Sequence, residues 1–525
     1  MRPRRAERLR RLLAQVSAHI GQEGNIMRKR QPSVAIVGAG LSGIALAHTL
    51  LERDIPFVMF EKASEVGGTW RDNVYPGICL DTAAATYCFP FAEKYDWSLV
   101  HPPGGEVQDY LREVARDLRL NERIRFNSEV TECRWEGGQW ELTTKDGVSA
   151  TADMLVMATG FLRVPSIPAF TGRGDFRGPQ FHSAEWNTGF DPNGKRVGVI
   201  GMGSSGIQIT GALSQMDCQV TQFIRTPQWI HTRENHQQSR LERSLFKMLP
   251  ALGRRIQNAR EEKIRRSDPK LLKNGEWRRF PGPGREAAFQ AFREDLEAHL
   301  KDPVLRAKMT PPDLPGCRRI PLSPGYYEAI QRPNVTIVRG GIDHIVENGL
   351  YDSHGDFHGL DAIVYATGFD AHAYFKPTKI FGVSGRELGE RWTSGGPEIY
   401  RSLMVPDYPN LFVMHGPFAA INNIPIPLTT AEMVGYVTKV ADYIAEHGRA
   451  LAPTVEAAKA YVHWIQSSMD GTIWATDCHS WYKTADGEAI LWPFGRQEHT
   501  AMLGELERAD FADFPSALSE AVRSR

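Results

Sequence analysis

Two stretches of the chain share one pattern: a short β-branched apolar run, a glycine-rich turn and an apolar helix. The first joins Val34–Val37 to Gly38-Ala-Gly40-Leu-Ser-Gly43, and the second joins Val197–Ile200 to Gly201-Met-Gly203-Ser-Ser-Gly206. In such a strand–turn–helix unit the first glycine makes the turn, the second admits a pyrophosphate and the third packs helix on strand. The helix N-terminus then faces the phosphate charge. One such motif is weak evidence, but two in strand context predict a protein that passes electrons between two dinucleotides.

The end of the following strand differs between the two stretches. The apolar run Phe57–Phe60 ends at Glu61, where an acid accepts hydrogen bonds from ribose hydroxyls. The run Gln219–Ile224 ends at Arg225-Thr226, and a guanidinium at this position suits a 2′-phosphate. We therefore predict FAD at the first site and NADPH at the second. The alternative is that Glu61 and Arg225 are ordinary solvated strand ends.

A second repeated phrase supports two homologous units. Asp153-Met-Leu-Val-Met-Ala-Thr-Gly160 returns almost unchanged as Asp361-Ala-Ile-Val-Tyr-Ala-Thr-Gly368, and a Pro/Gly-rich bridge from Val164 to Pro192 separates the units. The predicted fold class is α/β, with two Rossmann-like dinucleotide-binding domains and a helical insertion in the second. The expected domains are an FAD-binding domain (33–165 plus 369–525), an NADP-binding domain (190–230 plus 310–368), the insertion (231–309) and a basic extension (1–32).

The insertion is dense in Arg, Lys and Glu. Helical spacing over Arg240–Gln257 and Arg285–Leu300 predicts helices that form one wall of the site, although a solvated charged surface explains the same pattern.

The C-terminal part should return to the first unit. Pro409–Met414 is strand-like, and Thr429 or Thr430 is the expected N-cap of a helix that runs to Glu446. The positive end of this helix should point toward the flavin pyrimidine. The preceding loop, Phe418–Leu428, is apolar and rich in proline, which favours a hydrophobic pocket.

Composition excludes several classes of protein. Among 525 residues, 62 basic and 62 acidic residues balance, which argues against a nucleic-acid partner. Six cysteines without a CxxC pair indicate neither a disulfide framework nor a zinc site, so we expect no metal and a reducing cytoplasm. The spacing of Cys79 and Cys88 does not fit the dithiol loop of disulfide reductases. The first 30 residues hold nine Arg or Lys and lack a sustained apolar core, so we expect a frayed extension, with Met27 as a possible natural start, and no membrane anchor.

The bridge contains Phe176-Arg-Gly178-Pro-Gln-Phe-His182-Ser-Ala-Glu-Trp186-Asn187. This segment resembles FxGxxxHxxxW(P/D), the fingerprint of type I Baeyer–Villiger monooxygenases, with Asn187 as a departure at the last position. The resemblance runs from Ser33 to Phe494 and includes Gly67-Gly-Thr-Trp70, Tyr75-Pro-Gly77, Cys317-Arg-Arg319 and Ser480-Trp481-Tyr482. It implies NADPH- and O₂-dependent conversion of a ketone to an ester or lactone, through a C4a-peroxyflavin and a tetrahedral adduct.

The resemblance also implies roles for individual residues. Arg319 should stabilise the anionic states, Asp81 should orient Arg319, and these two are the predicted catalytic residues. Arg318 replaces the usual Lys and should meet the 2′-phosphate, whereas His182 is expected to be a hinge residue. The predicted cofactor-binding residues are Gly38, Gly40, Ser42, Gly43, Glu61, Thr69, Trp70, Asp81, Tyr87, Val130, Gly201, Gly203, Ser204, Ser205, Gly206, Arg225, Thr226, Arg318, Arg319 and Trp481.

Two other functions fit the same motifs. One is oxygenation of sulfur or amine nitrogen by a related flavin chemistry. The other, from a different class, is an NADPH-binding redox sensor or a peroxide-producing oxidase. The identity of the ketone and the oligomeric state stay open, and Trp186 with Arg319 favours the ketone reaction.

Overall fold

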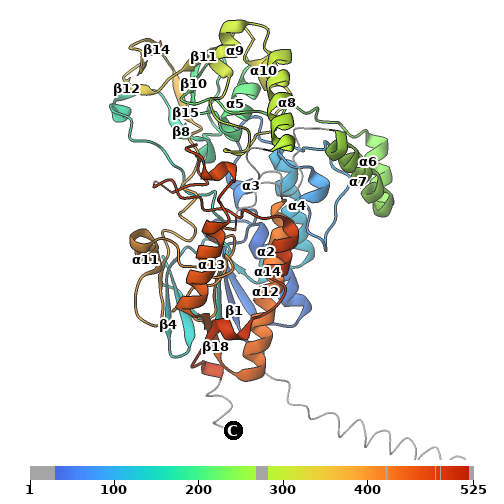
Figure 1. Ribbon diagram of the computed structural model, residues 1–525, viewed down its shortest axis with the longest axis vertical. Coiled ribbons are helices and arrows are strands. Elements are labelled where there is room, and N and C mark those ends of the chain that lie inside the picture. Colours follow the sequence, from blue (N-terminus) through green and yellow to red (C-terminus); the bar gives the residue numbers. More distant parts are fainter. Residues whose placement is uncertain (1–29, 268–281, 420–423, 479, 485, 519–525) are drawn as a thin grey trace, which may run out of the picture.

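The computed structural model describes residues 30–267, 282–419, 424–478, 480–484 and 486–518 (Figure 1). Most of the predicted basic extension and part of the Phe418–Leu428 loop lie outside these residues. Within the described part of the chain, no helix combines the length and apolar character needed to cross a membrane.

A five-stranded parallel sheet forms the lower half of the molecule in Figure 1. Its strand order is β17-β7-β1-β2-β3, and the glycine turn after β1 leads into α2 (Leu41–Glu52). All four residues of β1 and of β7 are buried, as expected for central strands of a sheet covered on both faces. The strands are β1 (Val34–Val37), β2 (Phe57–Phe60), β3 (Ile124–Arg125), β7 (Met154–Met157) and β17 (Leu411–Val413).

The upper half repeats this order in a second parallel sheet, β8-β15-β9-β10-β11, with α5 (Ser204–Leu213) after the second glycine turn. The prediction of two Rossmann-like units is therefore confirmed. The bridge expected to be a linker also supplies the edge strand β8, which pairs with β15. The strands are β8 (Gln180–His182), β9 (Arg196–Ile200), β10 (Gln219–Ile224), β11 (Val335–Arg339) and β15 (Ala362–Tyr365).

Each unit also carries a small antiparallel meander before its last central strand. In the first unit the meander is β4 (Val130–Glu136), β5 (Gln139–Thr144) and β6 (Ser149–Ala152), with β16 (Lys379–Phe381) added in parallel. In the second it is β12 (Ile342–Val346), β13 (Gly349–Asp352) and β14 (Phe357–Gly359). Near the C-terminus, β18 (Ala450–Pro453) pairs with β19 (Phe511–Phe514).

The insertion is helical, as predicted, but its first stretch is two helices. Leu249 closes α6 (Arg240–Met248), and α7 (Pro250–Ser267) starts at a proline, which cannot continue the hydrogen bonding of a helix. The third helix is α8 (Pro283–His299). The remaining helices are α3 (Thr69–Asp72), α4 (Gly104–Asp117), α9 (Pro303–Met309), α10 (Tyr326–Ala329), α11 (Leu388–Gly395), α13 (Val455–Ser467) and α14 (Arg496–Met502).

The helix expected to start at Thr429 or Thr430 begins earlier, so the capping prediction was wrong. α12 (Ile426–His447) has Pro425 at its N-cap position and a further proline, Pro427, in its first turn. Proline favours this first turn because its φ angle is already helical and it needs no hydrogen-bond acceptor there. Thr429 lies inside the helix and its hydroxyl donates to the carbonyl of Ile426 at 3.1 Å.

Contacts between the loop of residues 75–81 and helix α5 hold the two halves together. The hydroxyl of Ser205 donates to Tyr75 at 3.0 Å, and the Tyr75 hydroxyl donates to Gln208 at 3.0 Å. Gly77 lies so close to α5 that a β-carbon there would be 2.5 Å from the carbonyl oxygen of Gln208. The first unit therefore presents residues 75–81 directly to helix α5 of the second.

Candidate functional site

The first glycine turn has the shape of a phosphate cradle. Gly38 has φ +108°, and a β-carbon on it would be 2.6 Å from the carbonyl oxygen of Ala158. A β-carbon on Gly43 would be 2.1 Å from the carbonyl oxygen of Gly38, so only glycine lets α2 pack this close to β1. Helix α2, with Ser42 in its first turn, has neither a capping side chain nor an acidic residue at its N-terminus, which leaves its amides available to an anion.

The second turn repeats this geometry. Gly201 has φ +119°, and a β-carbon there would be 2.2 Å from the carbonyl oxygen of Ala366. Gly206 packs against Gly201 in the same way, whereas the side of Gly203 on which a β-carbon would stand is open. Helix α5 begins at Ser204 and also lacks a capping side chain and an acidic first turn. The residues present in both turns therefore fit the pyrophosphate of a dinucleotide.

Glu61 lies beside the first cradle, as the sequence indicated. Its carboxylate accepts the backbone amides of Ala39 at 2.8 Å and Ala63 at 3.0 Å. It also forms an ion pair with Arg71 at 3.0 Å and is 4% exposed. Glu61 therefore fixes the glycine turn itself, and its contact with a ribose stays a prediction.

Thr69 and Trp70 come to the same cradle from α3. The nearest atom to a β-carbon on Gly40 would be the α-carbon of Gly68 at 3.7 Å, immediately before α3. The indole of Trp70 donates to the hydroxyl of Tyr87 at 3.2 Å, and the two rings meet edge to face. Burial raises the pKa of Tyr87 to about 12, so this hydroxyl is a neutral group. Three residues predicted around FAD are therefore brought together.

A pair of arginines marks the second site. Arg225 follows β10 and is exposed, and Arg318 donates to the carbonyl of the neighbouring Thr226 at 3.4 Å. Burial lowers the pKa of Arg318, the ion pair with Asp313 at 2.9 Å opposes this effect, and the nearby charge of Arg225 lowers the pKa further. Two guanidinium groups at close range favour an anion of multiple charge between them.

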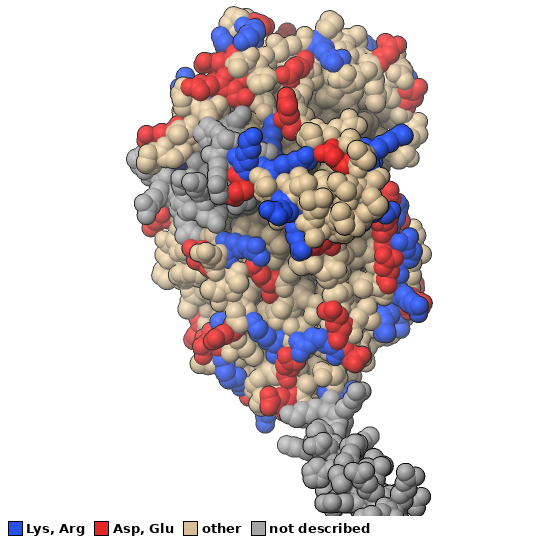
Figure 2. Space-filling view, turned by 90° about the vertical axis from the view of Figure 1, so that its right-hand side faces the viewer, with Lys and Arg blue, Asp and Glu red and all other residues tan. Residues whose placement is uncertain are grey.

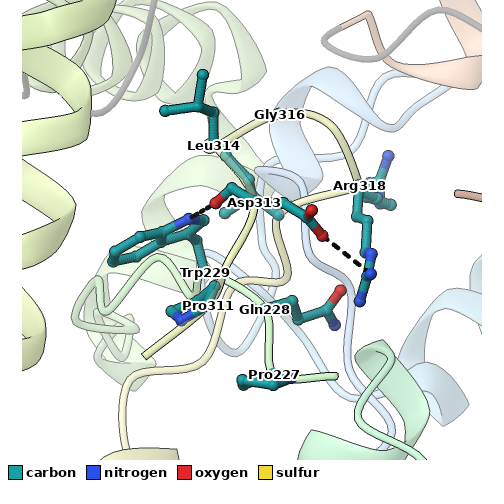
Figure 3. Close-up of a pocket in the computed structure, with 10 residues that line it drawn as sticks. Pro227, Gln228, Trp229, Pro311, Asp313, Leu314, Gly316 and Arg318 are labelled. Atoms are coloured by element: carbon teal, nitrogen blue, oxygen red, sulfur yellow. Dashed lines mark hydrogen bonds and ion pairs between the residues drawn. The ribbon is translucent and has the colours of Figure 1, made fainter. Parts of the chain in front are cut away.

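Arg318 also borders a small pocket (Figure 3). The pocket lies between the segment after β10 and the segment that leads to Arg319. The indole of Trp229 donates to the carbonyl of Asp313 at 2.6 Å, and the side chain of Asp313 reaches Arg318. These contacts fix the two segments against each other beside the arginine pair.

Arg319 and Asp81 form the centre of the site. The guanidinium donates from Nε to Oδ2 at 2.9 Å and from Nη2 to Oδ1 at 2.8 Å. Burial raises the pKa of Asp81, but the charge of Arg319 and its two hydrogen bonds outweigh burial and hold the pKa below its usual range. The charge of Asp81 in turn raises the pKa of Arg319. The pair is therefore fully ionised at neutral pH, and the side chain of Arg319 is still 37% exposed.

Tyr482 completes this centre, and the sequence analysis did not single it out as a site residue. Tyr482 is 2% exposed, and burial raises its pKa to about 12 while the charge of Arg319 lowers it. The adjacent Trp481, a predicted nicotinamide neighbour, stacks on Phe161 with ring centroids 5.9 Å apart. The available signal for Tyr482 was its place in the Ser480-Trp481-Tyr482 motif of the resemblance.

Val130 differs from the other predicted site residues, because it is a buried apolar residue of a strand. It begins β4, is 4% exposed, and its carbonyl accepts a hydrogen bond from Thr378 at 2.9 Å. Its assignment to cofactor binding rests on the resemblance alone.

Ser205, through its hydrogen bond to Tyr75, faces the first unit.

One prediction about cysteine is overturned. A disulfide joins Cys317 to Cys478 across 161 residues of sequence. The pairing was missed because the two residues are far apart in the chain and share no motif. It anchors the segment before Arg318 to the segment before Trp481.

Within the described residues, no cluster of His, Cys, Asp or Glu is arranged to hold a metal ion.

His182 has the contacts of a structural residue. Its Nδ1 accepts the amide of Ala184 at 3.1 Å, and its Nε2 lies 2.9 Å from the carbonyl oxygen of Gly368. The ring is fully buried, and burial lowers its pKa, so it is neutral. It joins β8 to the turn where the chain leaves the second sheet, a position that suits the expected hinge.

Comparisons with known proteins agree with this geometry. The model of the flavin-binding monooxygenase-like family matches residues 31–259. A monooxygenase of Mycobacterium tuberculosis (strain H37Rv), itself uncharacterized, is 38% identical over 92% of this chain and 97% of its own length. A Baeyer–Villiger monooxygenase of Streptomyces coelicolor is 35% identical over 92% of both chains. The solved structure of an oxidized steroid monooxygenase bound to NADP superposes with a TM-score of 0.81 at 28% identity, covering 92% of this chain and 99% of that one.

The family model covers both glycine turns, and the two relatives and the solved structure each cover 92% of this chain. The protein belongs to the Baeyer–Villiger monooxygenase family of flavin-binding monooxygenases.

Proposed function

We propose that the protein binds FAD in its first unit and NADPH in its second, and uses O₂ to convert a ketone to an ester or lactone. The observation that carries this proposal is the bidentate pair of Arg319 with Asp81, in which Asp81 belongs to the loop of the first unit that packs on α5 of the second. Similar proteins include a named Baeyer–Villiger monooxygenase and a steroid monooxygenase solved with NADP.

The division of cofactors follows the charges at the two strand ends. Glu61 next to the first cradle would repel a 2′-phosphate and accept ribose hydroxyls, which suits FAD. Arg225 and Arg318 beside the second cradle would bind the 2′-phosphate that distinguishes NADPH from NADH. The predicted domain boundaries are part of this proposal. Thr69, Trp70 and Tyr87 would contact FAD, and Trp481, which comes from the FAD-binding domain, would contact the nicotinamide.

The flavin, reduced by NADPH, would supply the reaction with O₂, and the chain must supply charge, orientation and exclusion of water. Negative charge develops on oxygen as it is delivered to the carbonyl carbon. Arg319, already charged and fixed, would stabilise that charge without reorganising. Preorganised donors of this kind contribute roughly 3–4 kcal/mol to the transition state.

Asp81 would act by positioning Arg319. Two hydrogen bonds to one edge of the guanidinium fix the plane of the group and leave Nη1 directed away from the carboxylate. Tyr482 and Tyr87, both neutral phenols, border the same charges and help to keep the centre dry.

The test is a panel of ketones with the purified yellow protein, in which NADPH loss, hydrogen peroxide and products are followed together. Wild-type protein should give ester or lactone, and Arg319→Ala should still bind FAD and be reduced but form no detectable ester. Arg116→Ala, at an exposed arginine of α4, is the matched control and should behave as wild type. Oxidation of thioethers or amines without any ester would instead indicate a heteroatom oxygenase, and peroxide alone would indicate an oxidase or a sensor.

We also propose a small-molecule ketone and O₂ as the partners of the reaction and a cytoplasmic location. In a reducing cytoplasm Cys317 and Cys478 would be held largely as thiols, so the bond between them would form only on oxidation.

A further inference from the structure

Helix α6 and the turn that follows it expose an unusual amount of apolar surface. Leu241 is 80% exposed, Met248 71% and Leu249 52%. Leu241, Leu245 and Met248 are spaced four and three residues apart and so share one face of α6. Other exposed large apolar residues, such as Val304 and Val383, stand singly on different elements. Single exposed residues are normal, but a grouped apolar face marks an interaction site.

The opposite face of the hairpin is firmly attached to the first unit. Phe246 is 2% exposed, and the amide of Gln257 donates to the carbonyl of Tyr95 at 2.8 Å. Arg243 donates to the carbonyl of Asp96 at 2.9 Å, and a capping box of Ser239 and Glu242 secures the start of α6. The apolar face is therefore held outward by a fixed support.

Basic side chains border this face. Residues 240–263 contain seven Lys or Arg and three Glu, in a chain whose total charge is balanced. Arg243, Arg254 and Arg260 form ion pairs with Glu106, Glu93 and Glu242. Arg240, Lys247 and Arg255 are exposed, and among the described residues none of the ion pairs includes them.

Figure 2 looks onto the side of the molecule where α6 and α7 lie, and there a tan surface is bordered by more blue than red side chains. On the helical wheel Arg240 and Lys247 fall together on one flank of the apolar face. The surface thus combines apolar residues at its centre with positive charge at its edge.

This combination favours one occupant over the others. A helix that lies in a membrane surface buries its apolar face at the boundary of headgroups and acyl chains, with Lys and Arg directed at anionic headgroups. A second copy of the chain in a two-fold contact would bring the same basic edges against each other. Polyanions such as nucleic acid would leave Leu241 and Met248 without a role.

We propose that the α6–α7 hairpin docks the protein on an anionic lipid surface. Leu241, Met248 and Leu249 would enter the boundary of headgroups and acyl chains, and Arg240, Lys247 and Arg255 would bind lipid phosphates. This is attachment to one face of a bilayer, and it does not depend on the reaction that the protein catalyses.

The experiment is co-sedimentation of the FAD-loaded protein with vesicles of phosphatidylcholine, alone or mixed with phosphatidylglycerol. Wild-type protein should sediment with the mixed vesicles, much less with phosphatidylcholine alone, and less as salt increases. The double variant Leu241→Glu/Met248→Glu should bind about tenfold more weakly or worse, because both apolar anchors are lost. Arg240→Glu/Lys247→Glu should lose the preference for the anionic vesicles.

Val304→Glu places the same charge at an apolar residue of α9 that is 65% exposed, and it is the matched control. It should sediment as wild type does. Flavin content and far-UV circular dichroism, measured on every variant, show that a loss of binding is not a loss of fold.

Three outcomes would overturn the proposal. The first is wild-type protein that stays in the supernatant with both kinds of vesicle. The second is an equal loss of binding in Val304→Glu. The third is a wild-type dimer that becomes a monomer in Leu241→Glu/Met248→Glu while vesicle binding is absent, which would assign the face to a second copy of the chain.

Discussion

The carboxylate of Asp81 holds one edge of the Arg319 guanidinium by two hydrogen bonds of 2.9 and 2.8 Å. Asp81 belongs to the loop that packs on α5, and Arg319 is 238 residues further along the chain. The position of the cation is therefore set by a part of the fold distant in sequence. Both groups keep their charge at neutral pH, so we expect Asp81 to contribute to the reaction by orienting Arg319.

Replacing Asp81 with Asn should separate orientation from charge. The amide keeps the size of the side chain but offers one acceptor, so Arg319 loses its fixed plane. We expect ester formation to fall by about 100-fold, the size of effect that small displacements of a catalytic group produce. NADPH consumption should continue, with peroxide replacing product. A product yield equal to that of wild type would show that Asp81 has no positioning role.

Arg225→Ala should change the preference between the two nicotinamide cofactors. The guanidinium can contact a 2′-phosphate, which NADH lacks, so the KM for NADPH should rise far more than the KM for NADH. Arg339→Ala is the matched control, because Arg339 lies opposite Ile224 at the end of the neighbouring strand. Equal changes in both constants would contradict the role of Arg225.

The buried His415 should make stability dependent on pH. Its Nε2 lies 2.9 Å from the hydroxyl of Thr430, and burial, with a further contribution from the nearby His499, lowers its pKa to about 4. In the unfolded chain a histidine binds a proton near its ordinary pKa of about 6.5. The unfolded state therefore binds more protons as pH falls from about 6.5 to 4, and the native state loses stability over this range.

The expected loss due to His415 is at most about 3 kcal/mol in the free energy of unfolding. Denaturant titrations of wild type and His415→Gln at several pH values would measure it. The variant should be less stable at neutral pH but show a shallower decline below pH 6.5. His354→Gln, at an exposed histidine, is the control, and parallel declines in wild type and His415→Gln would contradict the prediction.

Cys317→Ser should lower the free energy of unfolding under oxidising conditions. A cross-link over 161 residues restricts the unfolded chain, and removal of such a bond typically costs about 2–5 kcal/mol. Dithiothreitol should destabilise wild type by a similar amount and leave the variant unchanged. If reductant affects both proteins equally, the stabilisation has another source.

The parts of the fold that follow local rules were predictable. Both glycine turns could be located because strand, turn and helix are adjacent in sequence, and the charges of Glu61 and Arg225 lie at fixed distances from those turns. The start of α12 was misplaced because two threonines offered a familiar cap, while Pro425 and Pro427 provided an equally good start.

Contacts between distant segments were beyond sequence reasoning. Nothing local to Cys317 indicates Cys478, and nothing local to Tyr482 indicates that its hydroxyl meets the charge of Arg319. Asp81 and Arg319 could be named only through the resemblance, and their two hydrogen bonds needed the folded chain. The edge strand β8 was concealed because its three residues lie in a stretch rich in proline and glycine.

The segment that carries Arg319 is attached to the core of the first unit at several points. Cys317 is bonded to Cys478 and buried in that core, the indole of Trp474 donates to the carbonyl of Gly316 at 3.2 Å, and Asp81 holds the guanidinium. By its position in the chain, however, this segment belongs to the second unit. If the two units separate when one nicotinamide cofactor replaces another, these contacts would keep the Arg319 cation with the first unit while the hydride donor leaves.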